Sequence, residues 1–215
     1  MGAITLNDEI LVFPKNHVWE TPATSYPLEK VRLVKIVRTT YKKGVYRMEG
    51  VNGYDYFELK SPIKVTGLKI RKEMVMVDDP LHWYGMQALA AHCSGNVLCS
   101  GLGLGLIYHA LEKNTAVKSV DIIERNPDVI KLMRPHIPSK FNVIEQDLHE
   151  YIGYPNLIKK IYDCAVLDHW WGSSDREMRI DMMITRAKVM AIFPHANVYI
   201  WGVCNPAINP AIRTI

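Results

Sequence analysis

Three acidic residues stand at similar intervals in the second half of the chain, each just behind an apolar run. Glu124 lies 23 positions after Gly101, and Asp147 lies 23 positions after Glu124. Asp168 comes a further 21 positions along. If the apolar runs are parallel strands, the three carboxylates meet at the carboxyl edge of one sheet, where open α/β sheets bind ligands. Carboxylate oxygens accept hydrogen bonds, so the spacing predicts a site for a molecule with hydroxyl and amino groups, such as a nucleoside.

A glycine-rich segment, Gly101-Leu-Gly-Leu-Gly105, follows directly on the apolar run Asn96–Ser100. Glycines permit positive φ and close approach of a ligand to the backbone. If a helix begins after this segment, its first amides add a positive dipole end. A tight strand-to-helix turn that binds no ligand is the alternative interpretation. The predicted cofactor-binding residues are Gly101, Gly103, Gly105, Glu124, Asp147, Leu148 and Asp168.

Further polar and aromatic residues adjoin the last of the three acids. Asp168 is followed by His169, and because an unperturbed imidazole titrates near neutrality, the two are candidate catalytic residues. A loop histidine satisfied by the backbone is the other interpretation of His169. The adjacent tryptophans are predicted to form the wall of an acceptor or cofactor pocket, or else to cap the core. The candidate substrate-binding residues are His82, Tyr84, Trp170 and Trp171.

The elements that position these residues alternate between strand and helix after residue 78. Short apolar runs without polar alternation indicate parallel strands covered on both faces, which predicts a Rossmann-like α/β fold. The predicted strands are Asn96–Ser100, Val120–Ile123, Phe141–Ile144, Tyr162–Leu167 and Asn197–Val203. The predicted helices are Leu81–His92, Ile107–Leu111, Pro127–Met133, one within Leu148–Lys160, and one over residues 175–192.

Residues 1–77 have a different pattern, with short β-favouring runs separated by turn residues. Asn52-Gly53 between two such runs is a strong hairpin signal, because both residues accept positive φ. We therefore expect a small N-terminal antiparallel β-hairpin domain over residues 1–77, followed by the nucleotide-binding domain over residues 78–215. The predicted role of the N-terminal domain is to extend the fold or to form an oligomer contact.

Composition and charge exclude several classes of protein. The chain has 215 residues, of which 48% are hydrophobic, so it can bury a core. The net charge of +4 is too small to indicate nucleic-acid binding. The basic segment Lys30–Lys43 is interpreted as a solvated strand face, with a polyanion site as the alternative. No apolar run approaches the roughly 18 residues of a membrane span.

The four cysteines lie far apart and form no C-x-x-C pair, so they predict neither a disulfide framework nor a metal site. Cysteines used as small buried hydrophobes are typical of a reducing compartment. The first residues lack a basic segment followed by an apolar one, so no secretory signal is expected. Together these features predict a cytoplasmic protein without a membrane partner.

Four segments together resemble the successive motifs of class I S-adenosylmethionine-dependent methyltransferases: Val97–Gly105, Val120–Asp128, Val143–Asp147 and Tyr162–Asp168. Within that superfamily the chain is most similar to the spermidine synthase group, whose acidic and aromatic segment ahead of the glycines resembles residues 79–86. The resemblance covers about residues 75–203. It implies a sheet of order 3-2-1-4-5 and S-adenosylmethionine, or its decarboxylated form, as cofactor. Glu124 would then bind the ribose and Asp147 the adenine.

Departures from the spermidine synthase pattern bear on the reaction. That group places an aspartate in the glycine loop to hold the charged aminopropyl end, and Leu104 stands at that position here. The group also has a tyrosine and a histidine where this chain has Trp83-Tyr84, and a different sequence after the fourth-strand aspartate. These differences favour methyl transfer over aminopropyl transfer.

Only about a dozen residues follow Val203, and Pro206 and Pro210 interrupt them. We therefore expect the parallel sheet to be truncated after the fifth strand. Its edge then needs cover from the N-terminal β-layer or another subunit, so a homo-oligomer is expected. The leading hypothesis is an S-adenosylmethionine-dependent methyltransferase with a small-molecule acceptor. The alternatives are aminopropyl transfer, an inactive nucleoside-binding or assembly protein, and other chemistry on the same cofactor.

Overall fold

The computed structural model of the chain describes residues 5–7, 10–50, 53–170 and 176–202. Its centre is a five-stranded sheet in which every pair is parallel. The strand order is β11-β10-β9-β12-β13, which is the predicted order 3-2-1-4-5 of a Rossmann-like fold. The strands are β9 (Gly95–Ser100), β10 (Val117–Glu124), β11 (Asn142–Glu145), β12 (Cys164–Leu167) and β13 (Asn197–Ile200).

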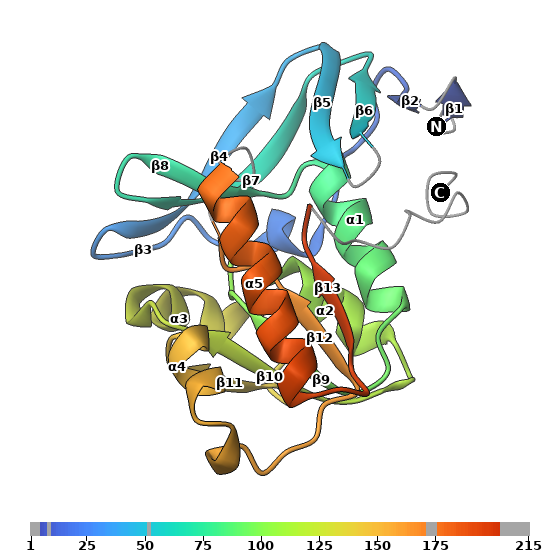
Figure 1. The fold of residues 1–215 in the computed structure, drawn as a ribbon. Helices are drawn as coiled ribbons and strands as arrows, with labels where there is room; N and C mark the ends of the chain where they lie inside the picture. Colours follow the sequence, from blue (N-terminus) through green and yellow to red (C-terminus); the bar gives the residue numbers. More distant parts are fainter. Residues whose placement is uncertain (1–4, 8–9, 51–52, 171–175, 203–215) are drawn as a thin grey trace.

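Helices cover both faces of this sheet (Figure 1). Alternate residues of each strand enter different cores: Val97 packs with the first three helices, and Leu98 packs with the last two. Burial on both faces explains why the strand sequences are apolar without alternation. The helices are α1 (Pro80–Ala91), α2 (Leu106–Lys113), α3 (Pro127–Met133), α4 (Leu148–Gly153) and α5 (Arg176–Ile192). Short 3-10 helices span Pro22–Ser25, Arg134–His136 and Pro155–Leu157.

Side-chain caps fix the starts of two helices around the parallel sheet. Asn126 caps α3, where its side chain accepts from the amides of Asp128 and Val129, and Pro127 takes the first helical position. Asp79 caps α1 and accepts from the amide of His82. Each cap satisfies donors that would otherwise be unpaired at the helix end.

The N-terminal strands form two four-stranded sheets. One has the order β1-β2-β6-β5 and the other β3-β4-β7-β8. The prediction of an antiparallel layer is wrong for one pair, because β2 and β6 run parallel. The chain between them forms β3 and β4 of the second sheet and then β5 of the first. The strands are β1 (Thr5–Asn7), β2 (Ile10–Phe13), β3 (Lys30–Val31), β4 (Val34–Tyr41), β5 (Gly44–Gly50), β6 (Gly53–Leu59), β7 (Ile63–Ile70) and β8 (Glu73–Val77).

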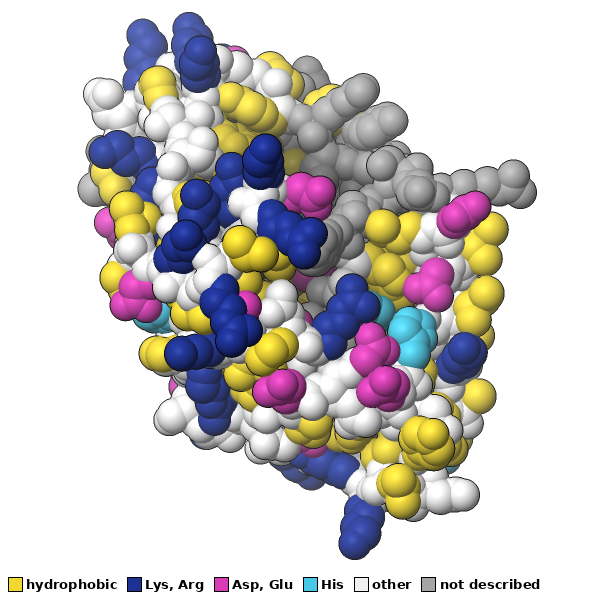
Figure 2. Space-filling model, turned by 90° about the vertical axis from the view of Figure 1, so that its left-hand side faces the viewer, with side chains coloured by type: hydrophobic (Ala, Val, Ile, Leu, Met, Phe, Trp, Pro, Cys, Tyr) yellow, Lys and Arg dark blue, Asp and Glu magenta, His cyan; other side chains and the backbone are white. Residues whose placement is uncertain are grey.

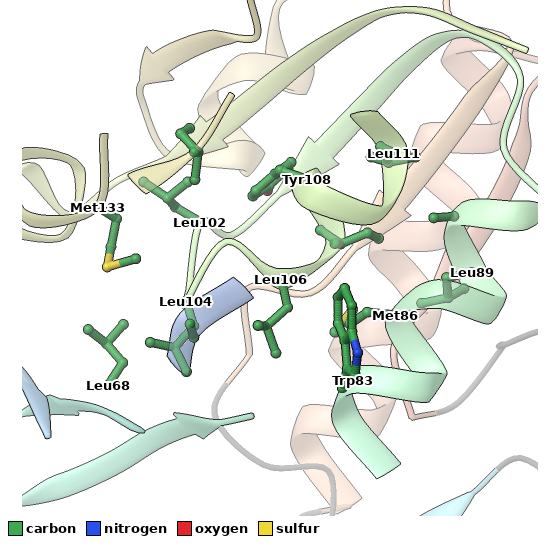
Figure 3. Close-up of a cluster of buried hydrophobic side chains, with 14 of the residues drawn as sticks. Leu68, Trp83, Met86, Leu89, Leu102, Leu104, Leu106, Tyr108, Leu111 and Met133 are labelled. Carbon is green, nitrogen blue, oxygen red and sulfur yellow. The ribbon is translucent and has the colours of Figure 1, made fainter. Parts of the chain in front are cut away.

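The predicted hairpin at Asn52-Gly53 agrees with the pairing on either side of it. β5 and β6 are antiparallel, with Gly50 opposite Gly53, although residues 51–52 lie outside the described part of the chain. The N-terminal layer shares one core with the parallel sheet rather than packing by itself. In that core Leu68 of β7 lies near Leu104 and Met133, as Figure 3 shows.

The basic segment Lys30–Lys43 lies mainly on β3 and β4. Lys30 pairs with Lys35, and Lys35 pairs with Lys69 of β7, so three lysines form a row across one face of the sheet. Lys and Arg side chains gather over the part of the molecule formed by these N-terminal strands (Figure 2). Side chains alternate along a strand, so Arg38 of the same segment points to the opposite face.

Three of the four cysteines, Cys93, Cys99 and Cys164, are buried free thiols, as predicted for small core residues. Cys204 lies outside the described residues, as does the chain beyond Gly202, so the predicted end of the sheet after its fifth strand stays a prediction. No helix in the described part of the chain is both long and apolar enough to cross a bilayer.

Candidate active site

A cavity of about 530 Å³ lies at the carboxyl ends of the parallel strands, under β7 and β8 of the N-terminal layer. It opens beside the point between β9 and β12 where the strand order reverses, which is the general ligand position of open α/β sheets. Nine of the predicted site residues line it: His82, Gly101, Gly103, Glu124, Asp147, Leu148, Asp168, His169 and Trp170. The structure thus brings together residues that are up to 88 positions apart in the chain.

Three further predicted residues are not placed at the cavity. Gly105 starts α2 with a φ of +72°, and a side chain there would collide with Ile137, so it serves packing. Tyr84 points into the core of the N-terminal layer, where it stacks on Phe13. Trp171 lies outside the described residues.

The glycine loop is shaped by a close approach of two strand ends. Gly101 has a φ of +89°, and a Cβ there would collide with the carbonyl oxygen of Asp168. The amide of Asp168 donates to the carbonyl of Ser100 at 2.9 Å, which holds the two strand ends together. Gly103, with a φ of +48°, leaves room for the thioether of Met76. The loop therefore requires glycine at position 101 for both backbone conformation and space.

Replacing Gly101 by alanine tests this requirement. We expect Gly101→Ala to lower the free energy of unfolding by at least about 2 kcal/mol, since both the positive φ and the contact with Asp168 become unfavourable. Urea unfolding followed by circular dichroism measures the change. Gly153→Ala is the matched control, because a Cβ there meets nothing within 4 Å. Equal stability of the two variants would contradict the role assigned to Gly101.

Glu124 bridges the loops that follow β9 and β10. One carboxylate oxygen accepts from the amide of Leu102 at 2.9 Å, and the other accepts from the amide of Asn126 at 2.8 Å. Each carboxylate oxygen has a second lone pair, so the side chain can still accept from a ligand in the cavity. The two amides orient the carboxylate before any ligand arrives, which reduces the cost of binding.

Asp147 caps α4 and accepts from the amide of His149 at 2.8 Å. Its second oxygen lies 3.4 Å from Nη1 of Arg125. Burial opposes ionisation, but this amide together with the charges of His149 and Arg125 outweighs it, so the pKa of Asp147 is lowered. Asp147 is therefore a carboxylate at neutral pH and can accept a hydrogen bond from a ligand amino group.

Asp168 and His82 are a half-buried acid and a half-buried base at the cavity. Burial raises the pKa of Asp168 to about 6, although the charge of His82 acts in the opposite direction. Burial alone would lower the pKa of His82, but Asp79, whose carboxylate lies 3.2 Å from its Nδ1, outweighs this effect and raises it. Asp168 is thus a carboxyl group whose ionisation changes near pH 6, within reach of neutral pH.

His169 is held away from solvent beside the same strand end. Its Nδ1 lies 2.7 Å from Oγ of Ser100, and its ring packs on Trp170 with the centroids 3.6 Å apart. Trp170 is fixed in turn by a 2.7 Å hydrogen bond from its indole nitrogen to Asp181 of α5. Burial, reinforced by the nearby His149, lowers the pKa of His169 to about 4. Its imidazole is therefore neutral at pH 7 and a weaker base than Asp168.

The other half of the cavity is apolar, and the sequence did not reveal it. Its walls are formed by side chains of β7, β8 and α5, among them Leu68, Ile70, Met74, Met76 and Met182. Met76 lies directly on the glycine loop, where its sulfur accepts from the amide of Leu104 at 3.2 Å. The methionine-rich run of β8 was visible, but nothing in its pattern showed that the strand folds over residues 101–104. Methionine side chains are flexible and adapt to ligands of irregular shape.

No protein-family model and no curated protein matches the sequence. Among solved structures the chain is similar to a precorrin 8W decarboxylase of Methanobacterium thermoautotrophicum, with 21% identity and a TM-score of 0.34 over 54% of this chain and 57% of that one. It is also similar to the spermidine synthase of Thermotoga maritima, with 10% identity and a TM-score of 0.36 over 60% and 56%. A protein of Streptococcus mutans assigned as a SAM-dependent methyltransferase matches at 11% identity and a TM-score of 0.43, over 69% and 44%. The chain spans about half the length of these solved proteins.

Proposed function

We propose that the protein is an S-adenosylmethionine-dependent transferase that acts on a small-molecule acceptor, with methyl transfer as its reaction. The observation that supports this most is the convergence of the glycine loop, Glu124 and Asp147 on one cavity at the reversal point of the sheet. A volume of about 530 Å³ is ample for a nucleoside with an amino-acid tail. The acceptor lone pairs of Glu124 and Asp147 fit the ribose hydroxyls and the adenine amino group, respectively.

The bound cofactor would supply a sulfonium that makes its methyl group an electrophile. The chain's own residues would align an acceptor with that group and exclude water. The apolar side chains of β8 and α5, together with Trp170, form the cavity wall that would align the acceptor and exclude water. Asp168, once ionised, can accept a proton from the acceptor at the same strand end.

The structure supports methyl over aminopropyl transfer through Leu104. Its side chain is 0% exposed and packs in the core beside Leu68 and Met133 (Figure 3). The position at which the spermidine synthase group carries an aspartate therefore does not face the cavity here. A carboxylate placed there would lose its hydration without a compensating partner.

Isothermal titration calorimetry with S-adenosylmethionine, its demethylated product and the decarboxylated cofactor tests the proposal. We expect saturable binding of the first two with similar affinity, and weaker binding of the decarboxylated form. Absence of heat with all three ligands would overturn the cofactor assignment. Preference for the decarboxylated form, together with turnover of a diamine, would replace methyl transfer by aminopropyl transfer.

A homo-oligomer remains the expected assembly. The solvent face of α5 supports it, because Ile180, Met183, Ile184 and Met190 are each more than 40% exposed. This helix lies over the half of the sheet that ends with β13. Clustered apolar side chains of this kind favour a subunit contact. The location of the protein in a reducing, cytoplasmic compartment is likewise a prediction from the sequence.

A further inference from the structure

A second cavity of about 530 Å³ lies within the N-terminal layer and shares no lining residue with the first. Its walls come from β4 and β7 and from the segment between β2 and the 3-10 helix Pro22–Ser25. Arg38 and Lys64 are its two permanently charged side chains. Among the described residues, none that lines this cavity is acidic. The cavity is therefore electropositive.

The strand register places the two cations on one face. Arg38 of β4 pairs with Thr66 of β7, and Thr40 pairs with Lys64 two positions further along the ladder. Residues two apart on a strand share a face, so these four side chains form a square with the two charges at opposite corners. Two like charges on one face repel each other, and an anion between them would remove that repulsion.

The guanidinium of Arg38 is fixed in place but not fully satisfied. Its Nη2 donates to the carbonyls of Thr24 at 2.9 Å and Tyr26 at 2.6 Å. Its Nη1 is buried and has no hydrogen-bond partner among the described residues. Buried donors are almost always paired in folded proteins, so an unpaired one beside a cavity points to a missing acceptor.

The carboxylate of Asp78 does not supply that acceptor. Asp78 lies close enough to Arg38 for the two charges to interact. Its oxygens, however, accept from the hydroxyl of Thr21 and the amide of Thr66, and it does not line the cavity. His17, at the cavity wall, contributes little charge at neutral pH, because burial lowers its pKa.

We propose that this second cavity binds a phosphate group, free or carried by a small molecule, between the guanidinium group of Arg38 and the ammonium group of Lys64. Arginine and lysine are the usual partners of phosphate oxygens, and the threonines of the square offer hydroxyl groups beside them. The proposed site bears on the two interpretations of the basic segment Lys30–Lys43, which were a solvated strand face and a polyanion site. One face of β4 carries Lys35, in a row with Lys30 of β3 and Lys69 of β7, and the other carries the anion site.

Titration of the full chain with inorganic phosphate, followed by amide NMR shifts, tests the proposal. We expect saturable shifts at Thr39, Thr40 and Lys64. Phosphate bound at the glycine loop would instead shift Leu102 and Leu104, so the two sites are distinguishable whether or not the proposed function holds. Acetate should bind about tenfold more weakly, since it offers fewer oxygens and less charge.

Lys64→Gln should weaken phosphate binding about tenfold, because it removes one charge-assisted hydrogen bond at an exposed position that does not support the fold. Lys188→Gln, at an exposed position on α5, is the matched control and should leave the affinity unchanged. Arg38→Gln should abolish saturation, with circular dichroism to verify its fold. Lack of saturable shifts at the cavity, equal affinity for acetate, or equal weakening by Lys64→Gln and Lys188→Gln would overturn the proposal.

Discussion

Replacement of Glu124 by glutamine should weaken S-adenosylmethionine binding about 100-fold. Both carboxylate oxygens already accept from backbone amides and have a lone pair left for a ribose hydroxyl. A glutamine keeps one acceptor oxygen and presents an amino group to the other amide, so one loop contact and one ligand contact are lost. Hydrogen bonds to a charged group contribute about 1.5–3 kcal/mol each, which corresponds to the expected loss. Isothermal titration calorimetry measures it.

Glu145→Gln is the matched control for this variant. Glu145 lies opposite Glu124 in the β10–β11 ladder, is exposed and does not line the cavity. The Glu145→Gln substitution therefore removes the same charge at the same level of the sheet, one strand away. We expect its affinity to stay within about twofold of the unchanged protein. If the two variants bind equally well, Glu124 does not hold the ribose.

Replacement of Asp168 by asparagine should reduce the rate of transfer by about 10²–10⁴-fold, the usual contribution of a positioned acid–base group. In the unchanged protein the rate should rise with pH through about 6, because burial raises the pKa of Asp168 to that value and only the ionised form accepts a proton. Glu150→Gln, an exposed acid on α4, is the control and should keep the full rate. Because the pKa of His169 is lowered to about 4, a rate that rises near pH 4 instead would assign the base to His169.

The same substitution should make the protein more stable at neutral pH. Asp168 has a higher pKa in the folded protein than in the unfolded chain, so the folded state binds the proton more tightly. Stability is then lost as the pH rises through the folded-state pKa, and the charge costs free energy at pH 7. We expect Asp168→Asn to gain about 1–2 kcal/mol at pH 7, allowing for the partial exposure of the carboxylate and the lost attraction to His82, and only a small fraction of that at pH 4. Urea unfolding at both pH values measures this, and a loss of stability at pH 7 would contradict it.

The parallel strands and the helices between them were predictable because their signals are local, whereas the strand order was expected only from the family resemblance. Apolar strands, glycines and caps such as Asn126 act through residues within a few positions of one another. The site acids were predictable for a related reason. Once the strands are parallel, Glu124 and Asp168 must share the carboxyl edge of the sheet, whatever the details of packing.

The N-terminal layer was less predictable because its pairing is not local. β2 pairs with β6 through residues that lie 46 positions apart, such as Ile10 and Tyr56, and the sequence carries no signal for a parallel partner at that distance. The surroundings of Tyr84 depend on the same distant contacts. It was proposed as a substrate-binding residue, and in the fold it stacks on Phe13 of β2 and does not line the cavity.

The sequence by itself determined the ligand edge of this protein: the glycine loop and the acids at the strand ends, with Asp168 among them. Only the tertiary structure decided what surrounds them. In the folded protein Met76 lies over the glycine loop, Leu104 is buried in the core, and desolvation raises the pKa of Asp168 to about 6. The physical reason is that strand and cap signals depend on neighbours in the chain, whereas burial and desolvation depend on residues that only folding brings together.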